Sequence, residues 1–214
     1  EGDMDFVCVK ARPRYGAVYV NKLYKALATH YDQTFVLYCL TDDEDGICEQ
    51  VKCMPLIHDV KGWWHKIQVF ELSVQLNSTL CFLDLDTVIV GSLNFLDCYS
   101  GDFALLEDFY RPGGFQSSVM LLSNGYGENV YKPFLKDPEG AMASCEPGQG
   151  PTWGDQRWIE MTVKKVDLLQ KLWPRKFISF KADIRKTMQL PYGSVVLCYH
   201  GEPRPHHFSE SVFF

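Results

Sequence analysis

The stretch Thr79-Leu80-Cys81-Phe82-Leu83-Asp84-Leu85-Asp86 is a continuous apolar run that leads directly into two carboxylates. An apolar run of this length is typical of a central parallel strand that is buried on both faces. In an open α/β sheet, ligands bind beyond the carboxyl ends of such strands. The position of Asp84 and Asp86 therefore predicts a ligand site at one edge of a sheet.

Strand-like and helix-like segments alternate before this stretch. We expect strands at 5–9, 34–39 and 51–56, and helices at 17–30 and 65–76, where apolar residues recur at helical spacing. The alternation predicts an α/β fold. Thr41-Asp42-Asp43 is a candidate helix N-cap.

The pattern changes after Asp86. Segments 103–106, 118–122 and 194–199 are strand-like, with longer connections between them. Residues 137–151 are rich in Pro and Gly and are expected to form a surface loop, either a lid or a plain connector. We find no repeat and no second domain.

Bulk properties narrow the class of protein. The 214 residues suit one domain, and the net charge of -6 argues against a nucleic-acid binder while allowing a local basic pocket. No pair of the eight cysteines has C-x-x-C spacing, so we expect reduced thiols in a reducing compartment. No signal peptide or transmembrane segment is evident. We therefore expect a cytoplasmic protein, in the host cytoplasm if it is viral, or a piece of a larger multidomain chain.

Asp84 and Asp86 are suited to share a divalent cation. Mg²⁺ and Mn²⁺ take oxygen ligands and keep open positions for phosphate oxygens. The late segment Tyr199-His200-Gly201-Glu202-Pro203-Arg204-Pro205-His206 adds a candidate imidazole ligand, His200, and a candidate phosphate cation, Arg204. Alone, this segment also fits a proline-rich, exposed tail.

Three further motifs carry polar groups. Asp155, in Gly154-Asp155-Gln156-Arg157-Trp158, is a candidate general base or sugar-hydroxyl acceptor, or else a helix cap. Lys66 follows Trp63 and Trp64, which are candidates for a cleft wall, although core packing is the commoner fate of tryptophan. The third motif is Phe115-Gln116-Ser117-Ser118-Val119, where polar groups precede a buried strand.

In this order, the motifs resemble GT-A glycosyltransferases of the glycogenin and bacterial galactosyltransferase type, over nearly the whole chain. The resemblance implies one domain, 1–214, with a mixed, mainly parallel, Rossmann-like central sheet flanked by helices. Its nucleotide-binding part would cover about 1–90 and its acceptor and sugar part about 91–214. Compact enzymes of this kind resemble bacterial and large-DNA-virus enzymes that build surface glycans.

The resemblance also implies roles for residues. Asp84, Asp86 and His200 would bind Mn²⁺ or Mg²⁺ against the diphosphate of a UDP-sugar, and the acceptor would be a glycan or protein-linked sugar. The nucleotide base would lie against Val9, Lys10, Arg12 and Tyr15. Further donor contacts would come from Lys66, Asp84, Leu85, Gln116, Ser117 and Arg204. Asp155 and Gln156 would face the reacting sugar. Gln116 stands in place of the usual Asn, and Arg204 in place of the usual Lys.

Other interpretations remain open. Asp84-Leu85-Asp86-Thr87-Val88 fits the first motif of haloacid-dehalogenase-type phosphatases, with Asp84 as nucleophile and Asp86 as acid/base. That motif normally ends the first strand, and its late acidic pair is incomplete here because Ile159 stands at the last position. A non-catalytic nucleotide-sugar-binding module is a second alternative. In a transferase, Asp155 would act as the base if the reaction inverts, and would support the sugar if it retains.

Overall fold

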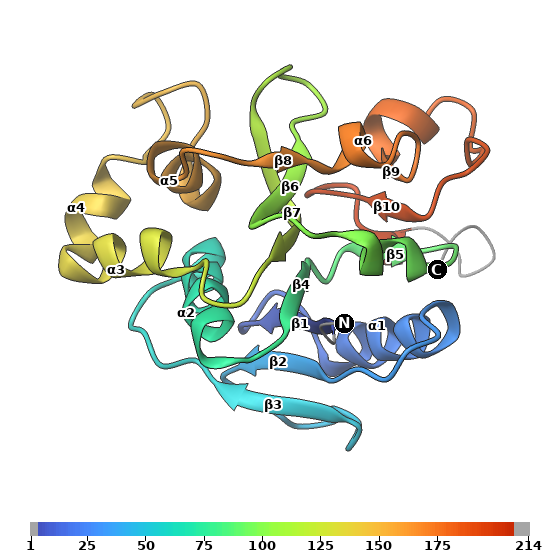
Figure 1. The fold of residues 1–214 in the computed structure, drawn as a ribbon, viewed down its shortest axis with the longest axis horizontal. Coiled ribbons are helices and arrows are strands. Elements are labelled where there is room, and N and C mark those ends of the chain that lie inside the picture. The colour runs from blue at the N-terminus through green and yellow to red at the C-terminus, as the bar shows by residue number, and fades with distance from the viewer. Residues whose placement is uncertain (1–3, 208–214) are drawn as a thin grey trace.

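A computed structural model describes residues 4–207, and within them the strands form a large and a small sheet (Figure 1). The large sheet has the order β3-β2-β1-β4-β7-β6-β8, and the small one has the order β5-β10-β9. The strands of the large sheet are β1 Met4–Lys10, β2 Leu37–Thr41, β3 Val51–Pro55, β4 Thr79–Leu83, β6 Phe103–Glu107, β7 Phe115–Leu122 and β8 Asp167–Leu168. Those of the small sheet are β5 Thr87–Ile89, β9 Phe177–Ser179 and β10 Val196–Cys198.

The large sheet is mixed and mainly parallel, as predicted. Strands β3, β2, β1 and β4 run parallel, and β7 is antiparallel to both β4 and β6. Strand β4 lies between β1 and β7, and Leu80 to Leu83 are at most 1% exposed. The apolar run before Asp84 is therefore a central strand of the sheet.

Helices cover both faces of this sheet. The α-helices are α1 Ala17–His30, α2 Ile67–Gln75, α3 Glu128–Lys136, α4 Pro138–Ala143, α5 Gly154–Thr162 and α6 Leu169–Leu172. Short helices of other types are η1 Gly62–Lys66, η2 Asn94–Cys98, η3 Phe180–Ile184 and η4 Pro205–His207. No helix within residues 4–207 is long and apolar enough to cross a membrane.

Alternate residues of the strands supply two cores. Phe6 and Cys81 point to the face that packs on α1 and the small sheet, where Leu23 is buried. Val7 and Phe82 point to the opposite face, which packs on α2, α3 and α5. The period of two along each strand thus divides the apolar residues between two helical layers.

Several sequence predictions hold to within a few residues. The helix predicted at 17–30 is α1, and the segments 5–9, 51–56 and 103–106 are β1, β3 and β6. The helix predicted at 65–76 is η1 followed by α2.

Other predictions are corrected by the structure. Thr41-Asp42-Asp43 caps no helix, because a turn follows β2 and the carboxylates of Asp42 and Asp43 pair with Arg12 and Lys10. Residues 137–151 are only partly a loop, because Asp137 accepts a hydrogen bond from the Gly140 backbone N–H and starts α4. By contrast, the strand predicted at 194–199 is confirmed as β10, which belongs to the small sheet.

The small sheet positions the late His-Gly segment. Strand β10 pairs antiparallel with β5, which follows Asp86 directly, so Cys198 lies opposite Thr87. The Tyr199 backbone N–H then donates to the Asp86 carbonyl at 3.3 Å. Residues 199–201 are thereby brought beside the carboxylates that end β4.

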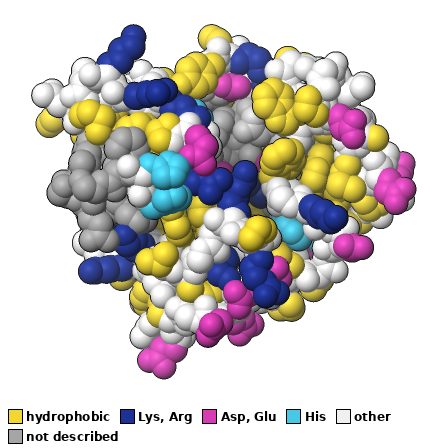
Figure 2. All heavy atoms as spheres, turned by 180° about the vertical axis from the view of Figure 1, so that it is seen from behind, with side chains coloured by type: hydrophobic (Ala, Val, Ile, Leu, Met, Phe, Trp, Pro, Cys, Tyr) yellow, Lys and Arg dark blue, Asp and Glu magenta, His cyan; other side chains and the backbone are white. Residues whose placement is uncertain are grey.

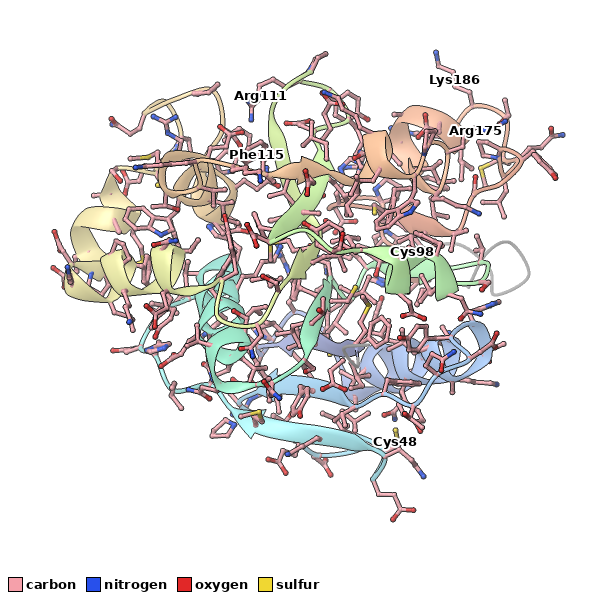
Figure 3. All side chains as sticks on the ribbon, in the orientation of Figure 1. Cys48, Cys98, Arg111, Phe115, Arg175 and Lys186 are labelled. Carbon is pink, nitrogen blue, oxygen red and sulfur yellow. The ribbon has the colours of Figure 1, made fainter. Side chains whose placement is uncertain are left out.

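The cysteines, all within residues 4–207, are free thiols. Cys48 and Cys98 lie well apart on the molecule (Figure 3). Cys8, Cys39 and Cys53 occupy one row across β1, β2 and β3. Burial raises the pKa of Cys81 and Cys198, as expected for thiols that pack as small apolar side chains.

Candidate functional site

The candidate site lies at the edge of the large sheet where β1, β2 and β4 end. Asp84 and Asp86 follow β4, and Asp42 and Asp43 follow β2. Strand β7 is antiparallel, so its beginning, with Ser117, lies at the same edge. The Asp84 backbone N–H donates to the Ser118 carbonyl at 2.8 Å and fixes this alignment.

A buried ion cluster joins three elements at this edge. Lys66, at the end of η1, places its ammonium 3.0 Å from Asp84 Oδ2 and 3.6 Å from Asp155 Oδ2. Ser117 of β7 donates its hydroxyl to Asp155 Oδ2 at 2.5 Å. Residues predicted separately as donor and sugar contacts therefore form one connected group.

Burial and neighbouring charges shift the ionisation of this cluster. Burial raises the pKa of Asp84 to about 6, with a further rise from Asp86, and Lys66 opposes the shift. Burial lowers the pKa of Lys66, but Asp155 and Asp84 more than offset it and hold the pKa above its ordinary value. Lys66 is therefore a buried cation that offsets the charge of both carboxylates.

Asp86 faces a second set of groups. Its Oδ2 accepts hydrogen bonds from the Tyr15 hydroxyl at 3.2 Å and from the Gly201 backbone N–H at 3.3 Å. Burial and the charge of Asp86 raise the pKa of Tyr15, so the phenol stays a donor. Gly201 has φ +99, a conformation that a side chain would strain, which explains a glycine at this contact.

His200 lies beside these carboxylates but turns its ring toward Ser179 and Phe109. Its Nε2 lies 2.6 Å from the Ser179 hydroxyl, and its ring stacks on Phe109 with centroids 5.4 Å apart. Burial and Lys181 lower the pKa of His200, so the imidazole is neutral at pH 7. His200 also has φ +38, which is uncommon for a residue with a side chain.

The donor set partly fits a divalent metal. Two carboxylates and a neutral imidazole are ligands that Mn²⁺ accepts, and Asp86 lies on the same loop edge as Gly201. In residues 4–207, however, no three His, Cys, Asp or Glu side chains converge on one point as a metal site. The His200 ring would have to leave Ser179 before its Nε2 could join Asp84 and Asp86.

The predicted base pocket has cations paired with acids. The Lys10 ammonium is buried and donates to the Asp43 carbonyl at 2.7 Å and to Asp43 Oδ2 at 3.1 Å. Arg12 is exposed, and its backbone N–H donates to Asp42 Oδ1 at 3.1 Å. Val9 is half-buried in the strand before them. Asp42 and Asp43 were missed as site residues, although parallel strands place the end of β2 beside the end of β1.

Arg204 connects the late segment to the first loop. Its guanidinium lies over the Tyr15 ring, 5.3 Å from the centroid, and its Nε is 3.1 Å from Glu202. Tyr15 therefore contacts both Asp86 and Arg204. On the face drawn in Figure 2, histidine and basic side chains gather near the middle of the view. A net charge of -6 thus coexists with local positive charge.

Three predicted residues do not aim at the ion cluster. The Leu85 side chain is buried in the core that packs on α1. The Gln116 amide donates to the Ser118 hydroxyl at 2.5 Å and accepts from the Ser118 backbone N–H. Gln156 donates to the Thr152 hydroxyl at 3.3 Å. Leu85 could reach a ligand only through its backbone.

The helix-cap alternative for Asp155 fails. Trp153 is the N-cap residue of α5, and Asp155 lies in the first turn with its carboxylate bound to Ser117 and Lys66. The dehalogenase-type alternative is also not favoured, since the strand before Asp84 is the fourth along the chain rather than the first.

No protein-family model and no curated protein matches the chain. Solved structures do match. GlyE of Streptococcus pneumoniae TIGR4, a glycosyltransferase, has a TM-score of 0.67 at 16% identity, over 95% of this chain and 56% of that one. The bifunctional glycosyltransferase WbbM has a TM-score of 0.64 at 13% identity, over 96% and 47%. The galactosyltransferase LgtC, in complex with donor and acceptor sugar analogues, has a TM-score of 0.56 at 14% identity, over 97% and 91%.

These similarities establish the fold. The chain has the GT-A fold of these glycosyltransferases, with the mixed, mainly parallel sheet described above. It spans about half the length of GlyE and WbbM and nearly all of LgtC. At such low identity the likeness is one of fold, and the activity has to be argued from the site.

Proposed function

We propose that the protein is a metal-dependent glycosyltransferase that moves a hexose from a UDP-sugar to a glycan or protein-linked acceptor. One observation carries the proposal. In a GT-A fold, Asp84, Lys66, Ser117 and Asp155 form one connected group at the edge of the sheet where ligands bind, and Asp86 lies two residues beyond Asp84 at the same edge. A structural role alone does not require three carboxylates at this place.

The donor would lie across this edge. Asp84, Asp86 and His200 would hold Mn²⁺ or Mg²⁺, which would neutralise charge on the departing diphosphate. Arg204, held over Tyr15, supplies a fixed cation for phosphate oxygens. Val9, Lys10 and Arg12 border the base pocket, with Lys10 fixed by Asp43.

Asp155 is assigned to the reacting sugar. Ser117 and Lys66 hold its Oδ2 in place, so the carboxylate is positioned before a substrate arrives. In an inverting reaction Asp155 accepts the proton of the attacking hydroxyl. In a retaining reaction it supports the sugar while the leaving phosphate takes that proton. Lys66 stands between the donor carboxylate Asp84 and the sugar carboxylate Asp155.

The remaining expectations are part of the proposal. Residues 1–90 form the nucleotide-binding part and 91–214 the acceptor and sugar part of one domain. The free cysteines are in keeping with a reducing compartment such as the cytoplasm.

The test is heat-induced unfolding with UDP, UDP-glucose, UDP-galactose and UDP-rhamnose, each with and without Mn²⁺. A ligand at about 100 times its Kd stabilises the folded state by about 2.7 kcal/mol. For a chain of this size that raises Tm by roughly 5–10 °C. We expect such a shift only when UDP or a UDP-sugar and Mn²⁺ are both present.

The alternatives predict other outcomes. Binding of UDP-sugars with no release of UDP in the presence of any acceptor or water would favour the non-catalytic module. The absence of any shift, together with hydrolysis of small phosphoesters, would contradict the proposal and support the phosphatase.

A further inference from the structure

A groove of about 470 Å³ opens beside the candidate site, between η1, α4 and the start of α5. Its lining includes Trp63, Trp64, Glu139, Met142, Glu146 and Gly154. Its volume lies within the range of roughly 300–1,000 Å³ found for sites that bind small ligands. None of the donor contacts proposed above uses it.

The groove is joined to the ion cluster through a single residue. Gly154 lines the groove, and the next residue, Asp155, belongs to the cluster. A Cβ atom at Gly154 would overlap the indole nitrogen of Trp63, so that ring packs directly on the backbone at the start of α5. The Gly154 backbone N–H donates to the Cys145 carbonyl at 2.8 Å, which ties the end of the α4 segment to the same point.

The walls combine an aromatic platform with acids. Trp63 is 42% exposed, whereas Trp64 is 8% exposed and stacks on Phe134 with centroids 5.3 Å apart. Of the two indoles, Trp63 is therefore the one open to a ligand, and it packs on the Gly154 backbone. Glu139 and Glu146 are exposed, so their carboxylates are open to hydroxyl donors. A flat ring packs well on the C–H face of a pyranose, and carboxylates accept hydrogen bonds from its hydroxyls.

Charge separates this groove from the donor pocket. Two carboxylates on the wall oppose a diphosphate, and the cations Lys10, Arg12 and Arg204 line no part of this groove. A neutral, polyhydroxylated chain suits the groove better than a second nucleotide. Because Gly154 lines the groove and Asp155 follows it directly, a chain lying on Trp63 would have its end beside the start of α5.

We infer that this groove binds an acceptor oligosaccharide, with Trp63 as the stacking platform for a sugar behind the one that reacts. The inference rests on the proposed transferase function and adds the acceptor class, a neutral glycan of two or more sugars. Trp63 binds the acceptor and takes no part in the chemistry at the donor.

The test measures binding of maltotetraose, cellotetraose, mannotetraose and chitotetraose by titration calorimetry, with UDP and Mn²⁺ present. We expect at least one of the four to bind the unaltered protein, and Trp63→Ala to weaken that binding by about tenfold or more. Trp63→Phe keeps a flat ring and should retain binding within about threefold. Tyr192→Ala removes an aromatic residue that is 90% exposed elsewhere, and it should bind as the unaltered protein does.

A second variant guards against misfolding of Trp63→Ala. The double change Glu139→Gln and Glu146→Gln keeps the shape of the groove and removes the two negative charges on its wall. It should also weaken binding of the oligosaccharide. If none of the four oligosaccharides binds, or if Trp63→Ala binds as tightly as Tyr192→Ala, the inference is overturned. The UDP- and Mn²⁺-dependent rise in Tm, measured on the same samples, reports separately on the proposed function.

Discussion

Asp84 and Asp86 stand two residues apart at the end of β4, yet their side chains contact different groups. Asp84 pairs with Lys66, and Asp86 accepts hydrogen bonds from Tyr15 and Gly201. A metal bound by both carboxylates would compete with Lys66 for Asp84. Asp86 would keep its hydrogen bond from Gly201. A substitution of Asp86 therefore leaves the Lys66–Asp84 ion pair in place, whereas a substitution of Asp84 removes it.

Replacing Asp86 with Asn keeps the shape of the side chain and removes its charge. We expect Asp86→Asn to lower the Mn²⁺-dependent rate of UDP release from a UDP-sugar by at least about 100-fold, since a bound metal contributes several kcal/mol to such a step. The measurement is steady-state UDP release, alongside Tm. Asp102→Asn, an exposed acid at the other end of the sheet, is the matched control. Full activity of Asp86→Asn would remove Asp86 from the metal site.

Lys66 carries a different expectation, which concerns stability. Removing one partner from a buried ion cluster leaves carboxylates unpaired, so Lys66→Met should lower the free energy of unfolding by about 3–5 kcal/mol at pH 8. Burial already raises the pKa of Asp84 to about 6, and without the opposing ammonium this carboxyl would hold its proton still more tightly in the folded than in the unfolded chain. Stability gained from that protonation is present at low pH and is lost as pH rises. The deficit should therefore shrink at pH 5.

Urea unfolding at pH 5, 6, 7 and 8 measures this deficit. Lys25→Met removes an exposed lysine of α1 and should change stability by no more than about 0.5 kcal/mol at any of these pH values. A deficit for Lys66→Met that is constant with pH would show that the cluster is not held by charge.

Gly154 tests how the aromatic groove is attached to the site. Gly154→Ala meets two costs, a positive φ of +66 and an overlap with Trp63. Gly148→Ala meets only the first, because its φ is +92 and nothing lies within 4 Å of the added methyl. Positive φ costs a residue with a side chain about 1–2 kcal/mol. We expect Gly154→Ala to exceed that loss, as measured by urea unfolding, and equal losses in the two variants would argue against the Trp63 contact.

At the scale of elements, one acid connects α5 to the β6–β7 hairpin. Glu160 of α5 pairs with Arg111 and accepts a hydrogen bond from the Phe115 backbone N–H at 2.9 Å. Arg111 lies in the connection between the two strands, and Phe115 begins β7 (Figure 3). Since Ser117 of β7 meets Asp155 of α5, this contact fixes the two elements that hold the sugar-facing carboxylate.

Glu160→Gln should loosen that attachment. The change leaves the half-buried Arg111 guanidinium with only its longer pair to Asp108, at 3.7 Å, and we expect a loss of about 1–3 kcal/mol in the free energy of unfolding. Glu128→Gln is the control, because Glu128 and Lys132 form an exposed pair on one helix that contributes about 0.3–0.5 kcal/mol. Urea unfolding of both variants decides the point, and a loss no larger than that of Glu128→Gln would contradict this role for Glu160.

Patterns of neighbouring residues in the sequence predicted the helices and strands whose formation depends on those same residues. Hydrophobic periodicity predicted α1 and the central strands, because burial of one or both faces of an element produces a regular pattern of apolar residues along the sequence. The three-residue strands β5 and β9 were not predicted, since their pairing with β10 depends on residues far apart in the chain. Helix α4 was also missed, although Asp137 followed by Pro138 is a recognisable helix start.

The residues of the candidate site also differ in how far the sequence predicts them. Asp84, Asp86 and Asp155 could be singled out by residue type and position, and the structure brings Asp84 and Asp155 to one lysine. The partner Ser179 could not be predicted, because no sequence pattern relates it to His200. Asp43 could have been placed near Lys10, because parallel strands end at the same edge of the sheet. The orientation of the His200 ring likewise depends on packing against Phe109.

At the scale of the whole molecule, the two proposed parts share their sheets. Strand β4 of residues 1–90 pairs with β7 of residues 91–214 through Leu80–Leu83 and Val119–Leu122. Strand β5 pairs with β10. The site is therefore built where the chain crosses repeatedly between the parts, and neither part keeps a complete core without the other.

This shared core predicts a single unfolding transition. Separating the parts would expose residues of β4 and β7 that are at most 2% exposed from Ser117 to Leu122 and from Leu80 to Leu83, so partial unfolding is disfavoured. Urea curves from far-UV circular dichroism and from tryptophan fluorescence should coincide, and the calorimetric and van't Hoff enthalpies should agree. Trp63 and Trp64 report on packing between the parts, because they contact Gly154 and Phe134 of the second, and three further tryptophans lie in the second part itself. Two separated transitions would mean that the nucleotide-binding part is stable alone, and ligands of the donor pocket would then protect only one of them.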